Sequence, residues 1–253
     1  MVEKIKNYYE NYDEEGRLFR DNAHKVEYLT SIRYFDKLFP KNSRILDTCA
    51  GAGRYSFYLA DKGHDVTACD LVEHNLNIIK SNPAAEKLSE ISACNVLDLS
   101  RFRDNSFDIV LCMGALYHLW EESERRQAIT ECVRVCKTGG IVVFAYILRN
   151  GAVLANINED ASNIDLLVSS LDYPDQGVFV CLNVDDVVNS TLNCGLEKIV
   201  NISTDCMVYA VADKLNAASN INFQKYMDYF YSICEDPSLI GVGIHGLLFC
   251  KKI

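Results

Sequence analysis

Residues 44–147 alternate short apolar runs with amphipathic stretches. The apolar runs predict five strands, at residues 44–48, 65–70, 91–95, 107–113 and 140–147. The stretches between them carry apolar side chains at helical spacing, at residues 55–59, 72–79 and 121–136. The run 107–113 is almost continuously apolar, which is typical of a parallel strand covered on both faces. Such alternation requires parallel pairing through right-handed crossovers and predicts a doubly wound α/β sheet.

The rest of the chain is less regular. Its pattern predicts helices at 24–39, 184–192 and 222–234, strands at 196–204 and 241–250, and helix or loop at 151–175. The segment 137–140 is predicted to stop the helix at 121–136, with glycine at the cap and Lys137 near the negative helix end. The sequence contains no internal repeat and no linker-like tract.

Composition narrows the class of protein. The 35 acidic and 25 basic residues give a net charge of -10, which disfavours nucleic acid and acidic membrane as partners. The chain has no long uncharged apolar run and no secretory leader pattern, so we expect neither a membrane span nor export. The 11 cysteines are odd in number and form no Cys-x-x-Cys pair, which predicts reduced thiols in a cytoplasmic protein.

The turn after the first strand is the first candidate site. In open α/β sheets ligands bind beyond the carboxyl ends of the strands, and the first strand normally flanks that crevice. Gly51 and Gly53 allow a sharp turn and a close approach of the main chain to a ligand, and Asp47 supplies a carboxylate. The alternative is that these glycines only make a strand-to-helix turn.

Two further strand ends carry polar groups. Asp70 ends the second strand, where a carboxylate can accept hydrogen bonds from ribose hydroxyls, unless it is only a turn acid. Asn95 ends the third strand and could read an adenine edge, whereas nearby Asp98 is more typical of a solvated loop. A dinucleotide site would place a third glycine where Ser56 stands. The pattern therefore favours an adenosine ligand without pyrophosphate.

Four segments of the sequence resemble successive motifs of the class I S-adenosylmethionine-dependent methyltransferases. They are RILDTCAGAGRYSFYLA, GHDVTACD, FDIVLCMGALYHL and CKTGGIVVFAY, in this order between residues 44 and 146. The resemblance implies a Rossmann-like seven-stranded sheet whose last strand, at 241–250, is antiparallel. It also implies one domain over residues 1–253, with a helical cap (1–40), a cofactor-binding half (41–147) and a substrate-side half (148–253).

The resemblance also implies which residues bind the cofactor, S-adenosyl-L-methionine, and its product, S-adenosyl-L-homocysteine. These are Asp47, Cys49, Ala50, Gly51 and Gly53 of the loop, Asp70 and Leu71 at the ribose, Asn95 and Val96 at the adenine, and Met113 and Gly114 at the methionine half. The chain departs from the family pattern twice. Cys49 stands where many members have a glycine, and Asn95 replaces the common aspartate.

Methyl transfer from a sulfonium requires alignment of the nucleophile and the methyl group, and a base only when the nucleophile carries a proton. His118 and Tyr117 follow the fourth strand and are the candidate catalytic residues. The alternative is that they bond main chain or orient the next helix. The other histidines lack metal-ligand spacing. Cys132 and Cys136 are four apart but lie on the apolar face of a predicted helix, where free cysteine behaves as a small core residue, so no metal is expected.

The N-terminal segment is a second candidate contact with the cofactor. Aromatic faces at Tyr8, Tyr9 and Tyr12 suit a sulfonium, and Arg17 suits the methionine carboxylate. An exposed tail is the alternative. Residues 148–182 and 226–231 could wall an acceptor pocket or a dimer face, although the aromatics of the second range are more typical of core.

The leading hypothesis is a cytoplasmic methyltransferase acting on a small molecule, as monomer or homodimer. Its rivals are an NAD-dependent oxidoreductase and a non-catalytic regulatory protein that keeps the cofactor pocket. Methylation of nucleic acid is disfavoured because MGAL stands where such enzymes carry an Asn/Asp-Pro-Pro-aromatic tetrapeptide.

Overall fold

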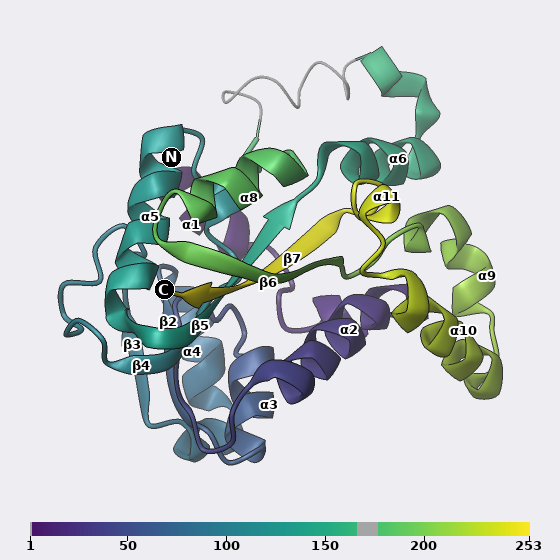
Figure 1. The fold of residues 1–253 in the computed structure, drawn as a ribbon. Helices are drawn as coiled ribbons and strands as arrows, with labels where there is room; N and C mark the ends of the chain where they lie inside the picture. The colour runs from purple at the N-terminus through teal and green to yellow at the C-terminus, as the bar shows by residue number, and fades with distance from the viewer. Residues whose placement is uncertain (1, 166–176) are drawn as a thin grey trace.

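The computed structural model describes residues 2–165 and 177–253, and its centre is one mixed sheet of seven strands between helices (Figure 1). The strands are β1 (Arg44–Asp47), β2 (Asp65–Asp70), β3 (Glu90–Ala93), β4 (Phe107–Cys112), β5 (Cys136–Ile147), β6 (Leu196–Ser203) and β7 (His245–Lys252). Their spatial order is β3-β2-β1-β4-β5-β7-β6. β7 is antiparallel to both of its neighbours, and the pairs among β1 to β5 are parallel. The predicted fold class and the antiparallel last strand are confirmed.

Helices cover both faces of the sheet. The α-helices are α1 (Val2–Glu10), α2 (Asn22–Leu38), α3 (Arg54–Asp61), α4 (Glu73–Ser81), α5 (Glu122–Val135), α6 (Arg149–Glu159), α8 (Val184–Leu192), α9 (Ala212–Asn216), α10 (Asn220–Ile233) and α11 (Pro237–Ile240). Short 3-10 turns are η1 (Arg17–Phe19), η2 (Pro83–Lys87), η3 (Leu116–His118), η4 (Ala161–Asn163) and η6 (Val208–Val211). Residues 166–176, which include the end of the segment predicted as helix or loop at 151–175, lie outside the described residues.

The alternation of side chains along the strands builds two hydrophobic cores. In β4, Ile109 and Leu111 pack with apolar residues of α2, α3 and α10, whereas Val110 and Cys112 pack with those of α5 and α8. Successive side chains of a strand point to opposite faces, so a continuous apolar run serves both cores. For this reason the fourth strand has the clearest strand pattern in the sequence.

The end of α5 differs from the prediction. The helix ends at Val135, and Cys136 already has extended backbone angles and pairs with Phe107 of β4. The residues expected as a helix cap therefore begin β5, and Gly139 has a φ of 79° within that strand. Lys137 donates a hydrogen bond to Asp108 over 2.7 Å instead of lying against the helix end.

The direction of β7 decides what reaches the ligand edge of the sheet. Its first residue, His245, pairs with Ile147 at the end of β5. An antiparallel strand thus begins at the edge where the parallel strands end. Among the described residues no helix is both long and apolar enough to span a membrane.

Candidate active site

The loop after β1 is held by the carboxylate that ends β2. Asp70 is only 6% exposed; its Oδ2 accepts from the Gly51 N–H over 2.8 Å and its Oδ1 accepts from the Val72 N–H over 2.8 Å. Gly51 has a φ of 53°, which favours glycine. Burial raises the pKa of Asp70 to about 6, although these hydrogen bonds oppose the shift. The carboxylate therefore fixes the loop and stands at the ligand edge.

Asp47 and Gly53 lie beneath the loop instead of facing a ligand. Neither lines either of the two cavities described below. The buried Asp47 carboxylate accepts from the Ser56 hydroxyl over 2.7 Å, and burial raises its pKa to about 7. Gly53, with a φ of 80°, caps the start of α3. In this structure Asp47 and Gly53 support the cofactor loop from below, through the bond to Ser56 and the start of α3.

A cavity of about 100 Å³ opens at the ends of β1, β2, β3 and β4. We call it the cofactor-side cavity. Most of the predicted cofactor and catalytic residues line it together, namely Cys49, Gly51, Asp70, Leu71, Asn95, Val96, Met113, Gly114, Tyr117 and His118. The Oδ1 of Asn95 accepts from the Leu97 N–H over 3.0 Å, so its carbonyl already has one partner. Four separate strand ends thus converge on one space, as the sequence predicted.

His118 has both ring nitrogens engaged. Its Nδ1 lies 2.8 Å from the Val178 carbonyl, which can only accept, so Nδ1 carries the proton. Its Nε2 then accepts from the Tyr9 hydroxyl over 2.9 Å. Burial lowers the pKa of His118 to about 4, and the ring is therefore neutral at pH 7. The geometry favours the alternative stated above, that His118 bonds main chain, over its role as base.

The N-terminal segment lies over the site. Ile5 and Tyr9 of α1 line the cofactor-side cavity. The Tyr8 ring stacks on Tyr12 with centroids 5.2 Å apart and meets Phe179 edge-on at 5.2 Å. These contacts match the predicted covering segment and not the exposed tail.

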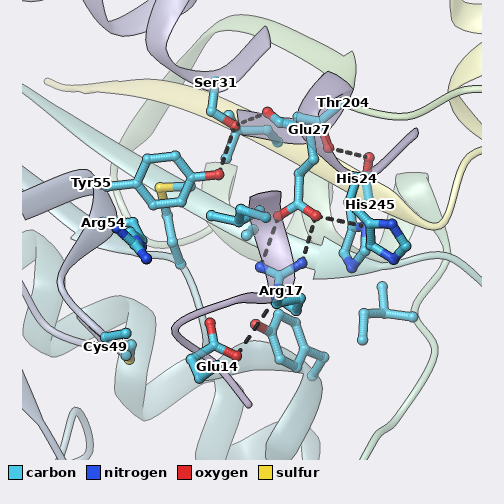
Figure 2. A pocket seen from close by; sticks show the side chains of 18 of the residues that line it. Glu14, Arg17, His24, Glu27, Ser31, Cys49, Arg54, Tyr55, Thr204 and His245 are labelled. Atoms are coloured by element: carbon cyan, nitrogen blue, oxygen red, sulfur yellow. Dashed lines mark hydrogen bonds and ion pairs between the residues drawn. The ribbon is translucent and has the colours of Figure 1, made fainter. Parts of the chain in front are cut away.

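A second cavity of about 250 Å³, the acceptor-side cavity, adjoins the first. The two share Tyr9, Glu14, Cys49, Gly51, Met113 and Tyr117 as walls. Its further lining includes aromatic rings from distant segments, together with Ala50 of the loop and the predicted Tyr12 and Arg17 (Figure 2). Tyr12 and Arg17 do not line the cofactor-side cavity.

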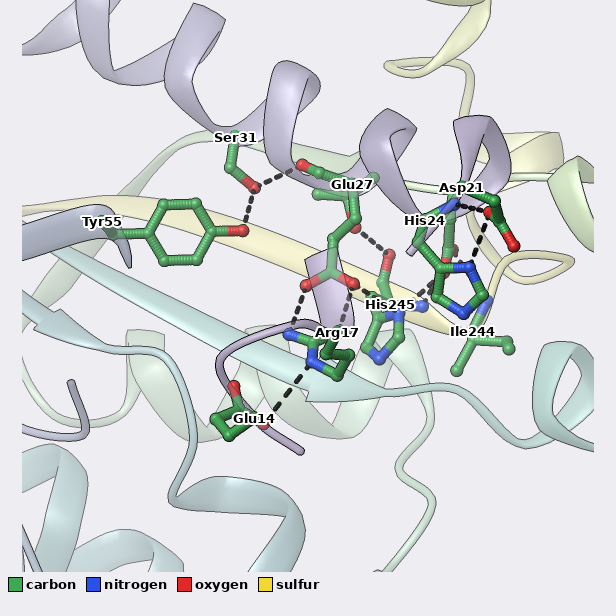
Figure 3. Close-up of polar contacts among 11 residues, drawn as sticks. Glu14, Arg17, Asp21, His24, Glu27, Ser31, Tyr55, Ile244 and His245 are labelled. Carbon is green, nitrogen blue, oxygen red and sulfur yellow. Dashed lines mark hydrogen bonds and ion pairs between the residues drawn. The ribbon is translucent and has the colours of Figure 1, made fainter. Parts of the chain in front are cut away.

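Charged side chains from four segments meet in the acceptor-side cavity (Figure 3). Arg17 of η1 binds both carboxylate oxygens of Glu27 of α2, at 2.6 and 3.1 Å, and its Nε lies 3.6 Å from Glu14. Nδ1 of His245 lies 2.6 Å from Asp205 and 3.5 Å from Glu27. Arg17 is predicted to bind the methionine carboxylate. In this structure its guanidinium forms ion pairs with Glu27 and Glu14 of the same chain.

The charged groups of this cluster shift one another's pKa values. Burial opposes ionisation of Glu27, but the charges of Arg17 and His245 outweigh it and lower the pKa of Glu27 to about 2. Burial would also lower the pKa of His245, yet the charges of Glu27 and Asp205 raise it above its usual value. Glu27, Asp205 and His245 were not predicted from the sequence. The one available signal was the position of His245 near the start of a predicted antiparallel strand.

Part of the chain is similar in sequence to known methyltransferases. Residues 46–144 match the family model for a methyltransferase domain. A ubiquinone biosynthesis O-methyltransferase of Bordetella avium is 32% identical over 108 residues, which cover 42% of this chain and 44% of the relative. The chain spans less than half the length of the curated relatives it matches, 45% and 46% for the first two.

Solved structures match nearly the whole chain. A methyltransferase of Thermotoga maritima, described as a possible histamine N-methyltransferase, has a TM-score of 0.60 at 14% identity and covers 97% of this chain and 98% of its own. The fold is that of a class I S-adenosylmethionine-dependent methyltransferase. The [4+2]-cyclase SpnF has a similar structure, with a TM-score of 0.57 at 18% identity over 89% of this chain and 80% of its own. The class I methyltransferase fold alone therefore does not decide the reaction.

The cofactor-side cavity fits an adenosine ligand by its donor and acceptor groups. Asp70 stands at the end of β2, and beside it Asn75 has a buried Oδ1 with no hydrogen-bond partner in the described part of the chain. Because a buried acceptor without a donor is costly, this pair suits a ligand with hydroxyl groups. Because Gly51 has no Cβ, the main chain of the loop can lie close to Glu14; an added Cβ would be 3.2 Å from the Glu14 side chain.

Proposed function

We propose that the protein transfers a methyl group from S-adenosyl-L-methionine to a small molecule. The observation that carries this proposal is the pair of adjoining cavities, one holding Asp70 and the other holding aromatic and ionisable groups. Cys49, Gly51 and Met113 form part of the wall between them, where a methyl group would pass. The cofactor supplies an electrophilic methyl group on a sulfonium when it is bound.

Each part of the chain has a role in this proposal. Asp70 and Asn75 would hold the ribose, and Asn95 and Val96 would lie at the adenine. The Tyr8, Tyr9 and Tyr12 rings cover the edge of the site and would exclude water from the transfer. The aromatic lining of the acceptor-side cavity supports a small organic acceptor, and the net charge of -10 argues against nucleic acid. All 11 cysteines are free thiols, which supports a reducing, cytoplasmic setting.

An NAD-dependent oxidoreductase is supported less well by the loop. Ser56 stands where a pyrophosphate site needs a third glycine, and its hydroxyl is bonded to Asp47.

Isothermal titration with S-adenosyl-L-homocysteine tests the proposal. We expect micromolar binding, about -8 kcal/mol at 1 μM. Asp70→Asn replaces one acceptor oxygen by a donor and should weaken binding at least tenfold, about 1.4 kcal/mol. Asp65→Asn is the matched control, because Asp65 begins the same strand at its opposite, exposed end, and it should leave the affinity within about twofold.

Three outcomes would contradict parts of the proposal. Equal affinity of wild type and Asp70→Asn would remove Asp70 from the site. Binding of NAD in place of S-adenosyl-L-homocysteine would favour the oxidoreductase. A protein that binds S-adenosyl-L-homocysteine but methylates no acceptor pool would instead fit the regulatory alternative.

A further inference from the structure

The start of β7 places a histidine in the acceptor-side cavity with one ring nitrogen engaged and one open. The side chain of His245 is 20% exposed and lines this cavity. Its Nδ1 is the atom that meets Asp205 and Glu27. In residues 2–165 and 177–253, Nε2 of His245 has no hydrogen-bond partner.

Asp205 fixes which nitrogen carries the proton. Its Oδ1 accepts from the backbone N–H groups of Ile244 and His245, over 2.9 and 3.0 Å, and its Oδ2 lies 2.6 Å from Nδ1 of His245. Asp205 is 1% exposed, so this orientation is held firmly. A carboxylate only accepts, and Nδ1 must therefore donate. Neutral His245 then presents the lone pair of Nε2.

We propose that His245 is the general base of the reaction and that Asp205 and Glu27 are its positioning residues. The inference rests on the proposed methyl transfer and narrows the acceptor to a nucleophile that carries a proton at neutral pH, such as a phenol, an alcohol or an ammonium group. Nε2 accepts the proton that the acceptor loses, and the acceptor's lone pair forms the new bond to carbon. The electron pair of the broken carbon–sulfur bond stays on sulfur, so charge and atoms balance.

Two other histidines fit this role less well. Both ring nitrogens of His118 are engaged, and His118 does not line the acceptor-side cavity. His24 does line it and pairs with Asp21 over 2.8 Å, but the Asp21 side chain is 28% exposed and caps the start of α2. His245 differs from both, because its partner carboxylate, Asp205, is 1% exposed and Glu27 lies 3.5 Å from the same ring nitrogen.

The groups around His245 set the direction of its pH dependence. Glu27 of α2 and Asp205 after β6 favour the imidazolium, and Arg17 of η1 opposes it. The two carboxylates outweigh burial and Arg17, so the pKa of His245 lies above its usual value. The base is competent above that pKa, so the rate should rise with pH through it. Asp205→Asn removes a charge that stabilises the imidazolium of His245, so the rise of the rate with pH should occur at lower pH.

The first test needs no acceptor. Long-range ¹H–¹⁵N NMR of histidine-labelled protein reports the tautomer and pKa of each ring. We expect His245 to be protonated at Nδ1 when neutral and to titrate above His64, a histidine outside both cavities. Asp205→Asn should lower the pKa of His245. A neutral ring protonated at Nε2 would overturn the proposal.

The second test compares acceptors with and without a proton. Catechol and 2-phenylethylamine carry one on the nucleophile, and iodide does not. His245→Asn keeps a donor where Nδ1 lies and removes Nε2, so it should slow transfer to the first two at least about 100-fold. Transfer to iodide and affinity for S-adenosyl-L-homocysteine should change less than about threefold. His64→Asn is the control and should match wild type throughout.

The results separate this inference from the proposed function. Equal loss of transfer to all three acceptors, or no loss, would show that His245 is not the base. A loss in His24→Asn without one in His245→Asn would assign the role to His24. Failure of the wild type to bind S-adenosyl-L-homocysteine would instead overturn the proposed function itself.

Discussion

Asp70 couples the cofactor loop to pH through a single carboxylate. Its hydrogen bonds to Gly51 and Val72 favour the charged form, but burial dominates and raises its pKa to about 6. A protonated Asp70 loses acceptor capacity on the oxygen that carries the proton. The ionised state needed to hold a ribose is therefore complete only above pH 7.

Affinity for S-adenosyl-L-homocysteine should consequently fall as the pH is lowered from 8 to 5. With a pKa of about 6, only about a tenth of Asp70 is ionised at pH 5, which predicts roughly tenfold weaker binding. Calorimetric titrations across this range measure the effect, with thermal unfolding at each pH as a check on folding. Asp70→Asn should show a smaller change over the same range. An affinity that is constant from pH 8 to 5 would contradict the role of Asp70.

At the scale of elements, Arg17 of η1 joins the N-terminal segment to α2. It makes two hydrogen bonds to Glu27, whose side chain is 11% exposed. Breaking a buried pair by removing one partner leaves an uncompensated charge, which costs about 3–5 kcal/mol. Arg17→Met should lower the free energy of unfolding by roughly this amount, measured by urea denaturation.

Lys87→Met provides the control for that measurement. Lys87 lies 2.6 Å from Asp61, but both side chains are at least half exposed, and exposed pairs contribute about 0–1 kcal/mol. The two ion pairs thus have the same contact distance and differ in burial. A loss in Arg17→Met no larger than that in Lys87→Met would show that Glu27 does not depend on its guanidinium.

The sequence predicted elements better than it predicted the site. All seven strands and the helices around Val26, Ile129 and Val187 follow from apolar periodicity. The pattern is strongest in β4, because both faces of that strand are covered. The polar residues Asp70 and Asn95 were expected at the cofactor side because they end or follow strands at one edge, whereas Cys49, Met113 and Gly114 were expected there only from the family resemblance. The helix cap predicted at 137–140 is wrong, because Gly139 and Gly140 lie within β5. The pairing of Cys136 with Phe107, which begins this strand, cannot be seen in the local sequence.

The charged cluster of the acceptor-side cavity shows why the remainder could not be predicted. Arg17, Glu27, Asp205 and His245 come from four segments separated by up to 228 positions, and no motif links them. Their meeting depends on the antiparallel direction of β7, which was implied only by family resemblance. Ile147 and His245 become neighbours through that pairing alone.

At the scale of the whole molecule, β7 ties the two halves of the chain together. It pairs with β5 on one side and β6 on the other. Leu248 and Cys250 pack into one hydrophobic core, and Leu247 and Phe249 into the other. Residues before 148 therefore cannot complete their sheet without the last strand.

We expect unfolding to be a single cooperative transition, as the predicted single domain requires. Trp120 packs against the core beside α5 and its fluorescence reports the first half, whereas far-UV circular dichroism reports the helices of both halves. Urea curves from the two probes should share one midpoint, and 100 Kd of S-adenosyl-L-homocysteine should raise the stability by about 2.7 kcal/mol in both. Separate midpoints, or a ligand shift confined to the fluorescence curve, would mean that residues 148–253 unfold independently. In that case the acceptor-side cavity could open without disturbing the cofactor-side cavity, since His245 and Asp205 belong to the second half and Asp70 to the first.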